Sequence, residues 1–125
     1  MKIDGDLRNI FKRKLNQYHW QAIETGGTGA GIPDSNFCYK NIEGWVEYKV
    51  TETKNVPLRP AQVAWHYTRA KHGGLTFVAV RQKHDGGPRK GEPIDKLWLL
   101  KGSETRRINA TGLVESEDYV LGVWT

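Results

Sequence analysis

The spacing of apolar residues predicts two helices in this chain. Residues 6–18 carry apolar side chains with the period of a helix, and Asp6 stands where a helix N-cap would be. These apolar residues are Leu7, Ile10, Phe11 and Leu15. Residues 58–74 predict the second helix, since Pro60 suits a first helical position and Gly73 suits a helix end.

Alternation and continuous apolar runs predict the strands. Residues 35–50 indicate a hairpin whose second arm places Ile42, Val46, Tyr48 and Val50 on one side and Glu43, Trp45, Glu47 and Lys49 on the other. Residues 75–80 are apolar throughout, which is typical of a central strand buried on both faces. The helix between them would allow this strand to lie parallel to residues 45–50. Further strands are predicted over residues 20–25, 95–101 and 118–124, with an unassigned link between the last two.

Charged residues inside the hairpin are the main chemical feature of the pattern. Asp34 and Glu47 stand at equal distances from the dipeptide at 40–41, so a two-residue turn there would place them opposite one another. Directly opposed residues have Cβ atoms about 4.5–5.5 Å apart, and two carboxylates so close need a cation between them, Mg²⁺ above all. Lys49 would project from the same face.

Two other arrangements of these residues are open. A turn over residues 41–44 would pair Asp34 with Thr51, which keeps Asp34, Glu47 and Lys49 on one face but separates the two acids. Alternatively, all three are ordinary strand residues that face solvent.

Composition and charge narrow the class of protein. The chain has 125 residues, 38% of them hydrophobic, which is enough for one domain with a single core. A formal net charge of +5 favours a polyanionic partner such as nucleic acid. Cys38 is the lone cysteine and no apolar run approaches a membrane span or a signal peptide, so we expect a cytoplasmic protein. The glycine-rich segment 26–31 lacks the Lys-Ser/Thr ending of a phosphate-binding P-loop, and the histidines lack zinc-site spacing.

The motif GIPD, followed by EYK on the next strand, resembles the PD-(D/E)XK nuclease superfamily. The ordered string over residues 20–82 is similar to the small phage-type nucleases of the VRR-NUC and Holliday-junction-resolvase-like branch. This resemblance implies an α/β fold with a central mixed β-sheet flanked by helices, restriction-endonuclease-like with an αβββαβ core. One departure is Ser35, which stands where the family usually has an aliphatic residue and is expected to loosen the strand.

The same resemblance implies roles for individual residues. Asp34 and Glu47 would bind the metal, helped by the backbone carbonyl of Tyr48, while Lys49 would orient the attacking water and screen charge. Gln62 matches a glutamine at the start of the helix beside the site. An upstream acid is also common in the family, and it is Glu24 or, on the first helix, Asp6; we favour Glu24.

Basic and aromatic residues supply candidate DNA contacts. Helical spacing places Gln62, His66 and Arg69 on one face of the second helix and Val63, Tyr67 and Ala70 on another, which we expect to be the core face. We therefore consider His66 and Arg69 as phosphate contacts, and Arg89 and Lys90 as a grip on a DNA arm, against the alternative that all four are solvated. Trp65 and Trp98 are expected in the core or an interface rather than as stacking platforms.

The predicted function is a Mg²⁺-dependent DNA endonuclease, with Mn²⁺ able to substitute. Its expected substrate is branched DNA such as a Holliday junction, as in DNA recombination, and cutting such a symmetric substrate on two strands calls for a homodimer. We expect it to be encoded by a phage and to act inside the host cell. The alternatives are a monomeric DNA nickase or flap nuclease, a non-catalytic nucleic-acid-binding module that keeps the fold, and a structural or interaction protein.

Overall fold

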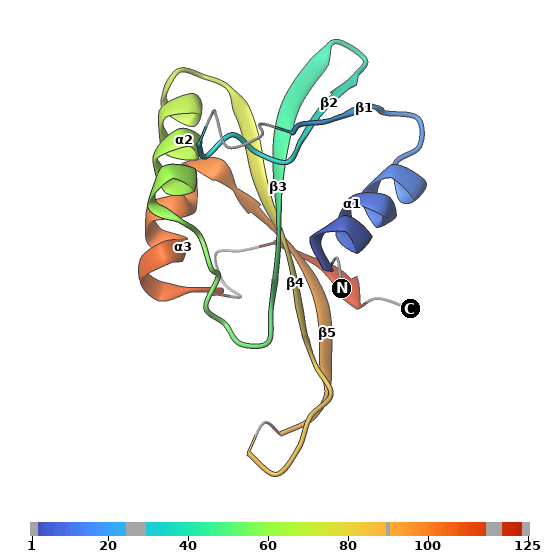
Figure 1. The fold of residues 1–125 in the computed structure, drawn as a ribbon, viewed down its shortest axis with the longest axis vertical. Helices are drawn as coiled ribbons and strands as arrows, with labels where there is room; N and C mark the ends of the chain where they lie inside the picture. The colour runs from blue at the N-terminus through green and yellow to red at the C-terminus, as the bar shows by residue number, and fades with distance from the viewer. Residues whose placement is uncertain (1–2, 25–29, 90, 115–118, 124–125) are drawn as a thin grey trace.

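The computed structural model describes residues 3–24, 30–89, 91–114 and 119–123, without the side chains of 3–6 and 119–123. Its elements are α1 (Ile3–Lys14), β1 (His19–Ala22), β2 (Ser35–Tyr39), β3 (Ile42–Thr51), α2 (Pro60–Lys71), β4 (Leu75–His84), β5 (Ile94–Lys101), the 3₁₀ turn η1 (Gly102–Glu104), α3 (Thr105–Thr111) and β6 (Tyr119–Val123). The strands form one six-stranded sheet in chain order. Figure 1 shows α2 and α3 on one side of this sheet and α1 on the other.

The sheet is mixed, as predicted. Strands β3 and β4 pair in parallel because α2 carries the chain from the end of one to the start of the other, and every other pair is antiparallel. Pro60 opens α2 and Gly73 follows its end with a φ of 87°, both as the sequence predicts.

The β2–β3 hairpin turns at the dipeptide that the sequence indicates. Lys40 and Asn41 have φ values of 46° and 71°, which a two-residue hairpin turn of this hand requires. The register pairs Tyr39 with Ile42 and Ser35 with Val46, so the next positions outward are Asp34 and Glu47. The first predicted register is therefore confirmed and the pairing of Asp34 with Thr51 is wrong. Ser35 is buried and also pairs with Ala22, so it does not loosen the strand.

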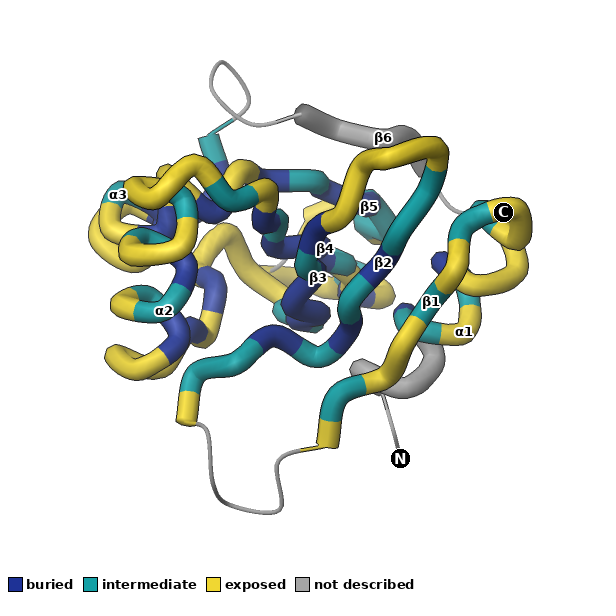
Figure 2. The backbone as a smooth tube through the Cα atoms, turned by 90° about the horizontal axis from the view of Figure 1, so that it is seen from above, coloured by how far each residue is buried: buried dark blue, intermediate teal, exposed yellow. Residues whose placement is uncertain are grey.

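Each face of the sheet carries its own apolar cluster. Leu7 and Phe11 of α1 pack over one face, together with Phe37, Val46, Tyr48, Ala79 and Leu97. On the opposite face, α3 and the chain that precedes α2 pack against β4 and β5. The buried apolar residues of this second cluster are Val56, Leu58, Val78, Val80, Trp98, Leu100, Ile108 and Leu113. Figure 2 shows the most buried parts of the chain along β3 and β4, between the two layers of helices. Trp98 is a core residue, as expected.

Three predictions about the elements need correction. Helix α1 begins at Ile3, so Asp6 lies within the helix and is not its N-cap. Strand β1 ends at Ala22 rather than at residue 25. The unassigned link contains α3, a short helix in which Ile108 is the residue that enters the apolar cluster. Among the described residues, no helix is long and apolar enough to span a membrane.

Candidate active site

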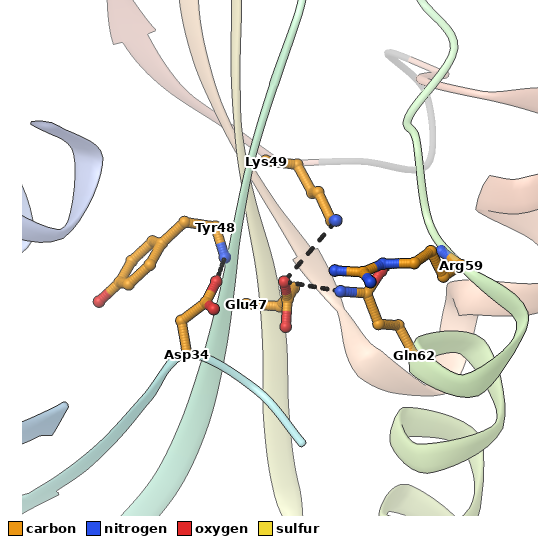
Figure 3. A network of polar contacts seen from close by, with 6 residues as sticks. All are labelled: Asp34, Glu47, Tyr48, Lys49, Arg59 and Gln62. Atoms are coloured by element: carbon orange, nitrogen blue, oxygen red, sulfur yellow. Dashed lines mark hydrogen bonds and ion pairs between the residues drawn. The ribbon is translucent and has the colours of Figure 1, made fainter. Parts of the chain in front are cut away.

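Strand β3 presents Glu47 and Lys49 to the face covered by α2. Glu47 is only 3% exposed and Lys49 only 9%, and Lys49 Nζ lies 3.8 Å from Glu47 Oε2. A carboxylate and an ammonium are costly to bury singly, so their pairing explains how the strand tolerates both. Figure 3 shows the two side chains converging beside α2.

Gln62 fixes the position of the Glu47 carboxylate. Its Nε2 donates a hydrogen bond of 3.1 Å to Glu47 Oε2, and its Oε1 accepts one of 2.9 Å from the backbone N–H of Arg59. One end of the amide is therefore tied to Arg59 at the start of α2 and the other end to Glu47, and Figure 3 shows the bond to Glu47. Gln62 therefore contacts Glu47 directly, while its role at the site stays a prediction.

Asp34 is held by three elements at the entry to β2. Its Oδ2 accepts a hydrogen bond of 2.9 Å from the backbone N–H of Tyr48, and its carbonyl oxygen accepts bonds from Arg8 Nη2 at 3.3 Å and from the Ile23 N–H at 2.8 Å. The orientation of the carboxylate is thus set by the strand that carries Glu47. The sequence did not single out Arg8 for this contact, since the only sign was its position as a basic residue beside the apolar stripe of α1.

The donor set of this site fits Mg²⁺. Asp34 and Glu47 hold opposed positions across the hairpin, and Figure 3 shows their carboxyl groups beside one another along β3. Asp34 Oδ1 makes no hydrogen bond to any described residue and is available to a ligand. Within the described ranges no group of three or more His, Cys, Asp or Glu side chains gathers, so water and a carbonyl such as that of Tyr48 would complete the shell.

The upstream acid remains a prediction. Glu24 is exposed and follows Ile23, whose N–H is bonded to the carbonyl of Asp34, so Glu24 lies near the site but makes no hydrogen bond or ion pair to the described residues. The side chain of Asp6 lies outside the described part of the chain.

The predicted contact of His66 with DNA is wrong. His66 is 0% exposed, and its Nδ1 lies 2.6 Å from Thr76 Oγ1. Burial, with a smaller effect from the charge of Lys49, lowers the pKa of His66 from 6.5 to about 4, so the ring is neutral at pH 7. The face of α2 that carries Gln62 and His66 is therefore buried against the sheet. Glu47 of β3 and Thr76 of β4 are the polar partners of these two side chains.

The expected core face of α2 is also corrected. Val63, Tyr67 and Ala70 are only half-buried. Val63 reaches the apolar cluster, while Tyr67 lies under the guanidinium of Arg106, 3.7 Å from its ring centroid. Helical spacing could not say which group faces the sheet, and Arg69, grouped with the buried Gln62 and His66, is exposed.

The remaining basic candidates are exposed. Arg69 lies at the surface of α2, and Arg89 lies in the loop between β4 and β5, while Lys90 is outside the described residues. Arg59, missed by sequence reasoning, is exposed, and its side chain extends from the start of α2 toward Gln62 in Figure 3. Its position directly before Pro60 was the one signal available.

Comparison with known proteins identifies the fold. No family model and no curated protein sequence matches the chain. Its structure is similar to that of Hjc, a Holliday junction resolvase from the archaeal hyperthermophile Archaeoglobus fulgidus, with a TM-score of 0.53 and 14% sequence identity over 92% of this chain and 84% of that one. At this identity the likeness concerns the fold alone. The chain therefore has the fold expected from its resemblance to the PD-(D/E)XK nucleases, a mixed sheet flanked by helices.

Proposed function

We propose that this protein is a Mg²⁺-dependent endonuclease that hydrolyses phosphodiester bonds in branched DNA. The observation that carries the proposal is the convergence of Asp34, Glu47, Lys49 and Gln62 at one point of the sheet. Support comes from the order of these residues in the PD-(D/E)XK pattern and from the similar fold of a protein described as a Holliday junction resolvase.

Each residue has a role that its contacts support. Asp34 and Glu47 would hold Mg²⁺, which supplies an acidified water and charge compensation at the phosphate. Gln62 would fix the orientation of the Glu47 carboxylate through its hydrogen bond, as partners behind a metal ligand generally do. Lys49 would supply a fixed positive charge where negative charge builds up on the phosphate oxygens, and would help to orient the attacking water.

The choice of branched DNA and of a dimer rests on the structural likeness and on symmetry. The protein of similar fold is described as a Holliday junction resolvase, which favours a branched substrate that is recognised by its shape. A four-way junction presents two equivalent strands, and two copies of the site in a homodimer would cut both. Cys38 and the phage-type resemblance are consistent with action inside an infected cell.

Incubation with labelled DNA tests the proposal. We expect cleavage of a four-way junction in Mg²⁺ or Mn²⁺, little cleavage of linear duplex, and none in EDTA. Asp34→Ala should bind the junction and fail to cut it. Cleavage that persists in EDTA or in Asp34→Ala would reject this site, and light scattering of the free protein checks the dimer.

The same panel separates the alternatives. A nickase or flap nuclease would leave the four-way junction intact and cut flap DNA, acting as a monomer. A binding module would hold junction DNA equally well with and without Mg²⁺ and cut nothing. A structural or interaction protein would show neither cleavage nor affinity for DNA.

A further inference from the structure

Two tryptophans and an arginine form a cluster where α2 meets β3, with Trp45 on β3 and Trp65 and Arg69 on α2. The Arg69 guanidinium lies 4.6 Å from the ring centroid of Trp65 and 5.6 Å from that of Trp45, within the range of cation–π attraction. The two indole rings meet edge to face with their centroids 5.4 Å apart. Both tryptophans are half-buried and Arg69 is exposed, so the charged layer lies at the surface.

The fold holds Arg69 in this position. A Cβ at Gly74 would lie 2.5 Å from Arg69 Cδ and 2.7 Å from Cγ, so the missing side chain of Gly74 lets the arginine stem lie against the end of α2. The Gly74 N–H also donates a 2.9 Å hydrogen bond to the Arg69 carbonyl. The guanidinium is therefore confined between the glycine turn and the indoles.

A hollow lies directly beside the cluster. It has a volume of about 800 Å³, and its walls include Trp65, Thr68, Arg69, His72 and Gly74. This volume is within the range of small-molecule sites in proteins, and its lining combines an aromatic ring, a cation and hydrogen-bonding groups. A flat, polar ring with an adjoining negative charge is the kind of ligand that such a lining suits.

The cluster adjoins the candidate active site. Trp45 precedes Glu47 by two residues on β3 and therefore projects from the same face, about 6–7 Å further along the strand. Trp65 follows Gln62 by one turn of α2. A DNA strand with its phosphate at Asp34 and Glu47 would reach the cluster with a neighbouring nucleotide.

We propose that Trp45, Trp65 and Arg69 form a stacking site for an unpaired base of the DNA, next to the phosphate that is cut. The exposed guanidinium plane stacks on the base, as arginine does in single-strand recognition, and its charge pairs with the flanking phosphate. The cation–π contacts with the two indoles hold the guanidinium in place. This inference rests on the proposed nuclease function and narrows its substrate to DNA with unpaired nucleotides at the branch. It also revises the expectation that Trp65 is a core or interface residue.

The chain contains a matched control for this cluster. Arg106 of α3 lies over the ring of Tyr67, 3.7 Å from the ring centroid, so it makes the same type of contact. Tyr67 lies on a different face of α2 from the residues that contact β3. Arg106→Ala therefore removes an equivalent cation–π pair and one positive charge without touching the proposed stacking site.

Fluorescence anisotropy of the full chain in EDTA tests the proposal without cleavage. Two labelled probes are compared, a duplex with a short single-stranded flap and the same duplex with the flap made of abasic residues. The wild type and Arg106→Ala should bind the base-bearing flap about 5- to 100-fold more tightly than the abasic flap, the range expected for stacking. Trp65→Ala and Arg69→Ala should bind the two probes equally, with Trp65→Phe in between.

The outcomes separate this inference from the proposed function. Equal binding of both probes by the wild type, or a preference that survives Trp65→Ala and Arg69→Ala, overturns the stacking site even if the protein cuts DNA in Mg²⁺. A preference that disappears in those two variants and persists in Arg106→Ala supports it. Absence of cleavage in Mg²⁺ alongside that result would instead refute the nuclease.

Discussion

The two faces of β3 carry different kinds of buried side chain, apolar on one face and charged on the other, although these residues alternate along one strand. Val46 and Tyr48 point to α1, where they join aromatic and aliphatic side chains in an apolar cluster. Glu47 and Lys49 point to α2, where they meet the amide of Gln62. Burial is nearly complete on both faces, with all four residues at most 9% exposed.

The difference shows how a small sheet can keep a charged site inside. On the α1 face, the side chains need only to fit together in shape and need no hydrogen-bonding partners, since apolar contacts are non-directional. On the α2 face, each buried polar group needs a hydrogen-bonding or charged partner, and the apolar cluster is displaced to β4, β5 and α3. Substitutions on the α1 face should therefore affect stability, and those on the α2 face should affect catalysis.

Neighbouring substitutions on β3 test this division most strongly. Lys49→Met removes the ammonium that would compensate charge at the phosphate, and we expect junction cleavage to fall about 10³-fold. Tyr48→Phe, one residue away on the other face, keeps its ring in the apolar cluster and should cleave within about twofold of wild type. Single-turnover kinetics in Mg²⁺ measure both. Comparable losses in the two variants would contradict the division between the faces.

The α1 face should show the opposite result. Leu7 of α1 is fully buried against the sheet. Leu7→Ala should lower the free energy of unfolding by about 2–5 kcal/mol through lost contacts and a cavity. Lys12→Ala, at an exposed position of the same helix, should change it by no more than about 0.5 kcal/mol. Urea denaturation followed by circular dichroism gives both values. A loss below 1 kcal/mol for Leu7→Ala would show that α1 is not part of the core.

His66 should make the α2 face sensitive to acid. Burial lowers the pKa of His66 to about 4 in the folded chain, against 6.5 when it is unfolded, so between these values the unfolded chain binds a proton that the folded chain does not. Stability should therefore fall as pH drops from about 6.5 toward 4, by about 3 kcal/mol in all. Urea unfolding at pH 7 and pH 4.5 should show a smaller drop in His66→Gln than in wild type. Identical drops would exclude His66 as the cause.

The sequence alone predicted those parts of the fold that local pattern determines. Short-range rules predict the alternation in β3, the start of α2 at Pro60 and the turn at Lys40–Asn41. The position of that turn fixes the register that opposes Asp34 and Glu47. The family resemblance suggested Gln62, and the structure places its amide in a hydrogen bond with Glu47.

Features that depend on packing between distant segments were not predictable in the same way. Helical spacing cannot tell which face of α2 is buried, so His66 was expected at the surface and lies in the interior. Helix α3 has seven residues, too few for a clear period. Arg8 reaches the carbonyl of Asp34 across a long stretch of chain, and no local pattern marks such a contact.

The smallest effect that we predict concerns Gln62, which contacts both Glu47 and the backbone N–H of Arg59. Gln62→Leu keeps the volume of the side chain but removes the donor to Glu47 and the acceptor for the Arg59 N–H. Loss of a partner behind a metal ligand typically costs about 10- to 100-fold in metal affinity or activity. Calorimetric titration with Mg²⁺ should show weaker binding, with cleavage restored in part by higher Mg²⁺.

A second glutamine supplies the control for this prediction. Gln82 accepts a hydrogen bond of 3.1 Å from Trp98 Nε1, away from Glu47, so Gln82→Leu also breaks a bond of a half-buried amide. It should leave the Mg²⁺ affinity unchanged, because the bond that it removes orients an indole and not a ligand. If Gln62→Leu and Gln82→Leu bound Mg²⁺ equally well, the hydrogen bond to Glu47 would serve packing alone, and the α2 face would differ from the α1 face only in composition.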